Sequence, residues 1–260
     1  MQLTLSIINA QGTIKATASA EQSVTLVYQS AYEEGDTLRL QSDDAGHVIV
    51  QLDSGLSPTY GYLTGDYHLP IPFGEKKESY APSSFIGDTH LLWVRAAQPQ
   101  EAGNYRNLAL NPLDHHGNTG LFPHAKANVE TRGESVFAAR NTIDGNIASN
   151  GHGPWPYESW GVGLIDDPEI AIHFGREVTI DKLILVLRAD FPHDNWWQTA
   201  LVSFSDGSES SLSFVKSGQP QVFCIPKRTV TWLKMSGMVK DPGDPSPFPA
   251  LVELEAWGWG

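Results

Sequence analysis

Residues 202–214 read Val-Ser-Phe-Ser-Asp-Gly-Ser-Glu-Ser-Ser-Leu-Ser-Phe, and this stretch decides the fold class. Apolar residues alternate with serine on both sides of the Asp206-Gly207 pair. Such alternation is typical of half-buried strands, and Asp-Gly favours the tight turn of a β-hairpin. The stretch therefore predicts two antiparallel strands with one face in a core.

The same alternation recurs along the rest of the chain. It appears at Leu3, Leu5 and Ile7, at Val24, Leu26 and Tyr28, at Val48, Val50 and Leu52, and at Ile170, Ile172 and Phe174. No segment of about 12 or more residues shows the apolar spacing of a capped helix, so helices should be short and few. We predict an all-β protein made of β-sandwiches.

Composition excludes several partners. The 260 residues include 17 Lys and Arg against 30 Asp and Glu, which gives a net charge of −13. Because the longest basic runs are pairs such as Lys76-Lys77, nucleic acids and anionic membranes are not expected partners. Charged residues make up 18% and apolar residues 40%, so the chain should bury a core.

A polar segment at residues 98–104 contains both Pro and Gly and predicts a domain boundary. We expect one β-sandwich domain over residues 1–104 and a second over residues 105–260. The stretch 67–85 carries three prolines, which favour an edge strand or a loop that packs on itself or on the second domain.

The start of the chain and its single cysteine carry weaker signals. No signal-peptide pattern and no membrane-spanning run is visible, so the sequence as given predicts a cytoplasmic protein, or a secreted one if a leader is missing. Cys224 lies in an apolar strand-like segment, where we expect a buried structural thiol.

From Tyr105 onward, the order of several motifs resembles one known family. These are Asn107-Leu108-Ala109, Ile143-Asp144-Gly145-Asn146, the strands at 170–175 and 178–187, and the closing run 251–258. Residues 105–260 resemble the discoidin or coagulation factor 5/8 type C domains, which are galactose-binding-like. The Thr-x-Trp that usually follows Asp-Gly-Asn is absent here. The first domain resembles no family that we recognise.

The resemblance implies a fold, a ligand class and a metal. The fold is a jelly roll whose long loops gather at one end, and many members bind carbohydrate. In the family, the turn at Asp144 and an acidic residue on the last strand, here Glu253, commonly enclose calcium. An ordinary turn without metal is the alternative, because Asp-Gly-Asn forms turns readily.

The loop after the apolar strand at 184–187 holds the first set of candidate ligand-binding residues. They are Arg188, Asp190, His193, Asp194, Trp196 and Trp197. Paired guanidinium donors, carboxylates and exposed indoles suit a saccharide. The alternative is a structural Arg188–Asp190 ion pair with one Trp in the core. Two adjacent Trp on a strand point to opposite faces, so at least one should face solvent or a loop.

A second loop, at residues 150–161, is rich in Gly, Pro and aromatic residues. Its candidates are His152, Trp155, Tyr157, Glu158 and Trp160. A loop that packs on itself is the alternative. If both loops lie at one rim, they should form a single aromatic-walled cleft.

Other chemistries have less support. The closest histidines, His115, His116 and His124, match no compact zinc motif, and neither a Gly-x-Ser-x-Gly elbow nor a Gly-rich phosphate loop is present. Three hypotheses stay open. The first is a non-catalytic glycan-binding protein. The second is a glycan-active hydrolase or lyase in which Glu158, Asp190 or Asp194 pairs with His193 or His152 as acid and base. The third is an assembly protein that uses the loops as an interface.

Overall fold

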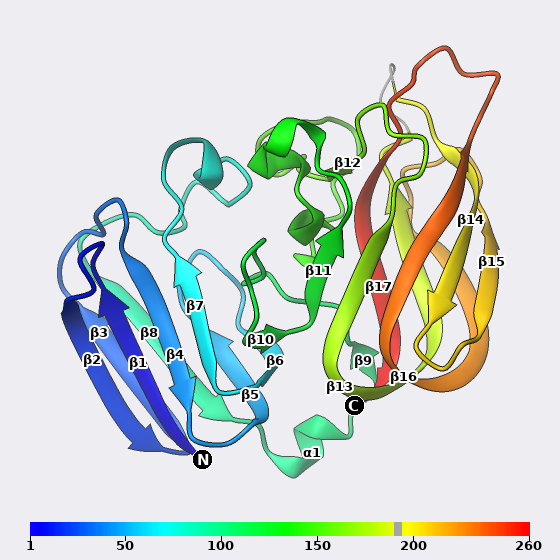
Figure 1. Ribbon diagram of the computed structural model, residues 1–260. Helices are drawn as coiled ribbons and strands as arrows, with labels where there is room; N and C mark the ends of the chain where they lie inside the picture. Colours follow the sequence, from blue (N-terminus) through cyan, green and yellow to red (C-terminus); the bar gives the residue numbers. More distant parts are fainter. Residues whose placement is uncertain (190–193) are drawn as a thin grey trace.

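A computed structural model describes residues 1–189 and 194–260 of the chain. Two β-sheet units lie side by side, and the short helix α1 (Pro99–Ala102) links them (Figure 1). The remaining helical segments are single 3₁₀ turns, namely η1 (Gly74–Lys77), η2 (Thr131–Gly133), η3 (Ser135–Phe137) and η4 (Ala139–Ile143). The all-β prediction is confirmed.

The first unit contains two sheets, with strand orders β2-β1-β4-β7 and β10-β6-β5-β8-β3. Its strands are β1 (Gln2–Ile8), β2 (Ile14–Glu21), β3 (Ser23–Tyr28), β4 (Thr37–Ser42), β5 (Gly46–Gln51), β6 (Thr59–Leu63), β7 (Asp66–Pro70), β8 (His90–Ala96) and β10 (Leu121–Phe122). The predicted alternating residues of β1, β3 and β5 are all buried in one cluster. As the prolines indicate, β7 is an edge strand.

The second unit forms one continuous sheet path, β12-β17-β13-β16-β14-β15, to which β11 and β9 attach. Its strands are β9 (Arg106–Asn107), β11 (His124–Ala127), β12 (Trp160–Gly161), β13 (Ile170–Leu187), β14 (Trp197–Phe204), β15 (Glu209–Ser213), β16 (Gln221–Lys240) and β17 (Ala250–Trp259). The long strands β13 and β16 pair antiparallel, and Figure 1 shows them side by side and strongly curved. In β13 the pairing register shifts after His173, next to Gly175, whose φ of 69° favours glycine.

The predicted hairpin is present as β14 and β15, which pair antiparallel. Val202, Phe204, Leu212 and Phe214 are buried in the second hydrophobic cluster, together with the alternating residues at the start of β13. Burial of alternate residues from paired strands thus builds this core, as the period-two pattern predicts.

The chain after residue 104 still contributes to the first unit before it enters the second. Strand β10 pairs with β6, and Leu113 and Leu121 belong to the first hydrophobic cluster. Residues just after 104 therefore complete the first core before the chain enters the second. The division into domains 1–104 and 105–260 stays a prediction.

The expectation of a buried Cys224 is wrong, because its side chain is exposed. In β16, Phe223 packs against the core and Ile225 is buried, so the residue between them points outward. Cys224 stands opposite Lys182 of β13. The apolar segment predicts a strand, which is confirmed, but its composition does not indicate which face of the strand carries the cysteine.

Candidate functional site

An internal ion pair stabilises the first predicted loop, at residues 188–197. Arg188 donates from Nε and Nη2 to the carboxylate of Asp194, at 2.8 and 2.9 Å, and both side chains are buried. Its Nη1 donates to Ser159 Oγ at 3.2 Å, which joins the two predicted loops. Arg188 therefore forms a structural ion pair, as the alternative interpretation predicts, but its partner is Asp194 and not Asp190. Asp190 and His193 lie outside the described residues.

The indoles that were expected to face a ligand lie mostly in the core. Trp197 begins β14 and is 1% exposed, and Trp160 in β12 is fully buried, with its ring centroid 6.1 Å from that of Trp197. Trp196 is partly buried, packs against the same hydrophobic cluster, and donates from Nε1 to Asp241 at 3.1 Å. The structure corrects the prediction for Trp160 and Trp197, because inward-facing strand positions place them beyond reach of a ligand.

A cavity of about 260 Å³ lies where the second predicted loop meets the first unit. We call it the Trp155 cavity, because the Trp155 indole at its wall is 43% exposed. Its lining consists of Gly55, Leu56, Ser57, Ser79, Tyr80, Ala81, Pro112, Arg140, Asp144, Gly145, Asn146, Trp155 and Glu158. Among the described candidates for ligand binding, the cavity thus unites Trp155 and Glu158, together with the metal candidate Asp144.

Backbone contacts hold the two units together around this cavity. The Trp155 N–H donates to the Glu78 carbonyl at 2.7 Å. Ser135 donates from its N–H to the Glu75 carboxylate and from its hydroxyl to the Glu75 carbonyl, at 2.5 and 2.7 Å. The loop at 74–85 therefore contacts the second unit, as one reading of its prolines predicts.

Arg140 lines the cavity and is buried. Its guanidinium donates to the carbonyls of Asp114, Ser79 and Pro112 at 2.9, 3.3 and 3.2 Å, and stacks 4.4 Å from the Tyr80 ring. Because Tyr80 and Ser79 belong to the first unit, this single side chain ties both units to the cavity wall. Burial raises the pKa of Tyr80, which keeps the phenol neutral.

Two buried carboxyl groups lie within hydrogen-bonding reach of each other in this wall. Burial, reinforced by Glu158, raises the pKa of Asp144 to about 7, although Arg140 lies only 3.6 Å from its carboxylate. Burial also raises the pKa of Glu158, whose Oε1 accepts a 2.9 Å bond from the Asn146 amide. Glu158 Oε2 is buried, and while both carboxyl groups are ionised no described residue donates a hydrogen bond to it. Near neutral pH the pair can share one proton.

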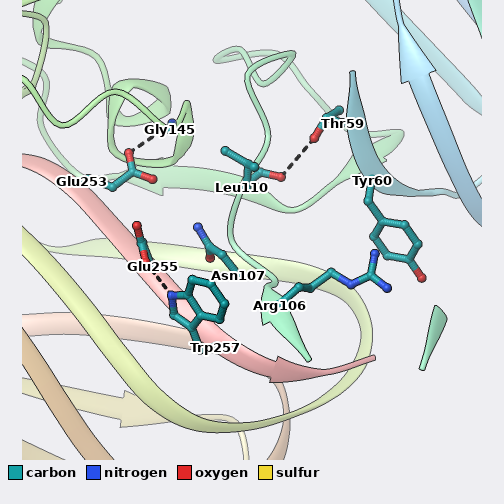
Figure 2. A pocket seen from close by; sticks show the side chains of 9 residues that line it. All are labelled: Thr59, Tyr60, Arg106, Asn107, Leu110, Gly145, Glu253, Glu255 and Trp257. Carbon is teal, nitrogen blue, oxygen red and sulfur yellow. Dashed lines mark hydrogen bonds between the residues drawn. The ribbon is translucent and has the colours of Figure 1, made fainter. Parts of the chain in front are cut away.

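A second cavity, of about 370 Å³, lies beside β17 and shares Gly145 with the first. Figure 2 shows Glu253, Glu255 and Trp257 on one side of it and Arg106 with Tyr60 on the other. We call it the β17 cavity. The guanidinium of Arg106 stacks 3.8 Å from the Tyr60 ring, and the Trp257 indole donates to Glu255.

The metal candidate Glu253 faces this second cavity. Its Oε2 accepts a 3.3 Å bond from the Gly145 N–H (Figure 2). Its Oε1 is buried and has no partner in the part of the chain that the structure describes. Burial, followed by the charge of Asp144, raises the pKa of Glu253 well above its usual range. A cation near Asp144 and Glu253 would relieve this cost, so the donor set fits calcium in chemistry. Within residues 1–189 and 194–260, no three His, Cys, Asp or Glu gather at a metal-binding spacing.

The remaining predicted residues are dispersed. His152 is exposed, and Tyr157 is partly buried with its ring against Gly151. His124 pairs with Asp114 at 2.8 Å, while His115 contacts the His68 carbonyl at 2.7 Å. The two predicted loops meet at Arg188 and Ser159, but they do not bring their described aromatic residues into one cleft.

Sequence analysis missed Arg140, Tyr80 and Asn146. In the sequence, Asn146 stands out only as part of a turn, and nothing around Arg140 marks it as the partner of a tyrosine 60 residues earlier. The family resemblance gave one usable signal, because it marks Asp144 as a metal candidate.

In the described residues, no helix has the length and apolar character needed to cross a membrane. No protein-family model matches the sequence, and no curated protein matches it either.

Several solved structures are similar to the chain. Chitosan-binding module 1 of a chitosanase/glucanase from Paenibacillus sp. IK-5 is 18% identical, with a TM-score of 0.42, over 59% of this chain and 99% of that chain. A fucose-binding module of Streptococcus pneumoniae is 13% identical, with a TM-score of 0.43, over 60% and 99%. The family 32 module of C. perfringens NanJ, solved with galactose, is 15% identical, with a TM-score of 0.39, over 51% and 91%. The chain is thus similar to carbohydrate-binding modules over part of its length.

Proposed function

We propose that this protein binds a saccharide in the Trp155 cavity and does not transform it. The observation that carries the proposal is the exposed Trp155 indole beside a polar wall of buried carboxyl groups. An indole offers a flat apolar surface to one face of a pyranose ring, and carboxylates accept hydrogen bonds from hydroxyl groups. These are the groups that a sugar presents.

The size and rigidity of the cavity support a small ligand. Its volume of about 260 Å³ is slightly below the roughly 300–1,000 Å³ of typical ligand pockets, which suits a single sugar ring. The wall is held by the buried Arg140 and by the backbone bond from Trp155 to Glu78. A preformed wall reduces the entropy that binding must lose.

The geometry favours binding over glycoside hydrolysis by these carboxyls. Hydrolases that use two carboxyl groups separate them by about 5 to 9.5 Å, so that a sugar or a water fits between them. Asp144 and Glu158 instead lie within hydrogen-bonding reach of each other. Asp194, another candidate of the enzyme hypothesis, is engaged by Arg188.

The proposal is tested by a glycan array followed by titration calorimetry of the best ligand. We expect Trp155→Ala to weaken binding about tenfold or more, because the stacking surface is lost. Trp232→Ala, on the partly exposed face of β16, serves as the matched control and should leave the affinity unchanged. Absence of saccharide binding by the intact chain, with and without calcium, would overturn the proposal.

We also propose calcium as a structural ion bound by Asp144 and Glu253. Two observations support it: the buried Oε1 of Glu253 has no partner among the described residues, and the two carboxylates repel each other. Calcium takes six to eight oxygen ligands, so backbone carbonyls of the loop would complete the site. We expect calcium to raise the Tm, and Glu253→Gln to abolish that shift. An equal Tm in calcium and in EDTA would contradict the proposal.

A further inference from the structure

We propose that the β17 cavity is a second saccharide-binding site, separate from the Trp155 cavity. The proposal goes beyond the proposed function, because the two cavities share only Gly145 and present different side chains to a ligand. Strands β17 and β9 supply most of the groups that would contact a sugar here.

The alternation of β17 gives this cavity an aromatic wall. Leu254 and Ala256 belong to the core of the second unit. The alternate residues Glu255 and Trp257 therefore face the other side of the sheet, where both line the cavity. The Lys182 ammonium lies 4.6 Å from the centre of the Trp257 ring but is not part of the lining. It therefore covers a part of the indole that is turned away from the cavity.

Arg106 forms the facing wall in a fixed orientation. Its guanidinium stacks 3.8 Å from the Tyr60 ring, and its Nε donates to the Asn104 carbonyl at 3.3 Å. Its Nη1 is not buried and has no acceptor in the part of the chain that the structure describes. The wall therefore keeps one nitrogen donor for a ligand.

Between the walls lie a second donor and an acceptor. The Oδ1 of Asn107 accepts bonds from the N–H groups of Ala109 and Ala256, at 3.0 and 3.1 Å. These bonds fix the amide and direct its Nδ2 toward the cavity, where no described residue accepts from it (Figure 2). Glu255 is fixed as well, because its Oε2 accepts a bond from the Trp257 indole. Its Oε1 points away from the indole and has no donor among the described residues (Figure 2).

A sugar ring matches this set of groups. Its C–H face can pack on an indole, and each hydroxyl both donates and accepts, so hydroxyls can serve Arg106, Asn107 and Glu255 together. A purely apolar ligand would leave these three groups without partners. Phosphate or sulfate accepts hydrogen bonds but has few or none to donate, so Glu255 would remain without a donor. The cavity volume of about 370 Å³ lies within the roughly 300–1,000 Å³ of typical ligand pockets.

The indole N–H signals in nitrogen-15 NMR spectra report on each cavity separately. The intact chain is titrated with glucose, galactose, mannose, fucose and N-acetylglucosamine at a fixed calcium concentration. We expect at least one of these sugars to shift the Trp257 Nε1–H signal along a saturable curve. Absence of any such shift with all five sugars would overturn the proposal.

Asn107→Asp tests the polar contacts, since it keeps the oxygen that accepts the two backbone bonds and removes the free Nδ2 donor. The affinity measured at Trp257 should fall about tenfold. Asn104→Asp makes the same chemical change at an exposed residue outside the lining and should leave the affinity within about twofold. Arg106→Lys, which loses the planar guanidinium, is the second variant and should also weaken binding. Unchanged affinity in both Asn107→Asp and Arg106→Lys would overturn the proposal.

Trp155→Ala separates this site from the one in the proposed function. The Trp257 shift should persist in this variant with the same affinity. A shift that disappears would come from occupation of the Trp155 cavity and would overturn the second site. If sugars shift only the Trp155 signal, the second site fails and the proposed function stands. If they shift only the Trp257 signal, the reverse holds.

Discussion

The two Trp-rich loops have similar compositions and opposite structural roles. The loop at 188–197 has its described polar groups engaged internally, because Arg188 and Asp194 pair and Trp197 enters the core. The loop at 150–161 instead presents Trp155 to solvent beside the carboxyl group of Glu158, one oxygen of which has no partner among the described residues. The same residue types thus stabilise the fold in one loop and line a cavity in the other.

Hydrogen-bond satisfaction distinguishes the two loops better than composition does. A buried charge that is fully paired stabilises a unique arrangement, whereas a buried carboxylate oxygen without a partner is costly unless a ligand or ion completes it. The difference points to the Trp155 cavity as the place where binding free energy is available.

The largest expected effect comes from removing the buried Arg188–Asp194 ion pair in the loop at 188–197. Arg188→Gln leaves Asp194 buried without its cation, which should reduce the free energy of unfolding by about 3–5 kcal/mol. Urea denaturation measures the change. Arg132→Gln breaks the exposed pair with Glu134 and should cost less than about 1 kcal/mol. A similar decrease in the free energy of unfolding in the two variants would show that the Arg188–Asp194 pair does not stabilise the fold more than an exposed ion pair does.

The cavity wall should make stability depend on pH. In the folded state the pKa of Asp144 is about 7 against an ordinary value of 3.8, so folding favours its protonated form. Its contribution is fully present below about pH 4 and is lost as the pH rises through about 7. The free energy of unfolding falls by at most about 4 kcal/mol over this range. Asp144, Glu158 and Glu253 contribute to this fall together, because their titrations are coupled.

Asp144→Asn should flatten this profile, as measured by denaturation between pH 4 and 8 in EDTA. Asp88→Asn, at an exposed carboxylate, should leave the wild-type profile unchanged. A wild-type slope that persists in Asp144→Asn would contradict the assignment of the titration to this wall.

A paired substitution sharpens the contrast between the loops. Trp155→Ala should weaken saccharide binding about tenfold and change the free energy of unfolding by less than about 1 kcal/mol, since its indole is 43% exposed. Trp196→Ala should do the reverse, costing about 1–3 kcal/mol while the affinity stays within twofold. Calorimetry and denaturation on both variants would reveal any exchange of these roles.

The smallest effect concerns Cys224, which was expected in the core and is exposed. Cys224→Ser should change the free energy of unfolding by less than about 0.5 kcal/mol. In the native protein the thiol should react with a maleimide without denaturant. Protection until unfolding would place the side chain inside after all.

Much of the strand content could be predicted from alternation, because one buried face imposes a period of two on any strand. The core residues of β1, β3, β5 and β13 were identified in this way. The candidate site was only partly predictable. Glu158 and Trp155 were found through composition, but Arg140 and Tyr80 were not, since their contact joins segments 60 residues apart.

The sequence by itself determined the all-β class, the hairpin at 202–214 and the excess of acidic residues, because these follow from local pattern and composition. Only the tertiary structure decided which Trp side chains enter the core, which carboxyl groups lie next to each other, and which acceptors the Arg140 guanidinium bonds to. These outcomes depend on strand register and on contacts between the two units. Neither can be read from a local sequence pattern, because the residues involved are far apart in the chain.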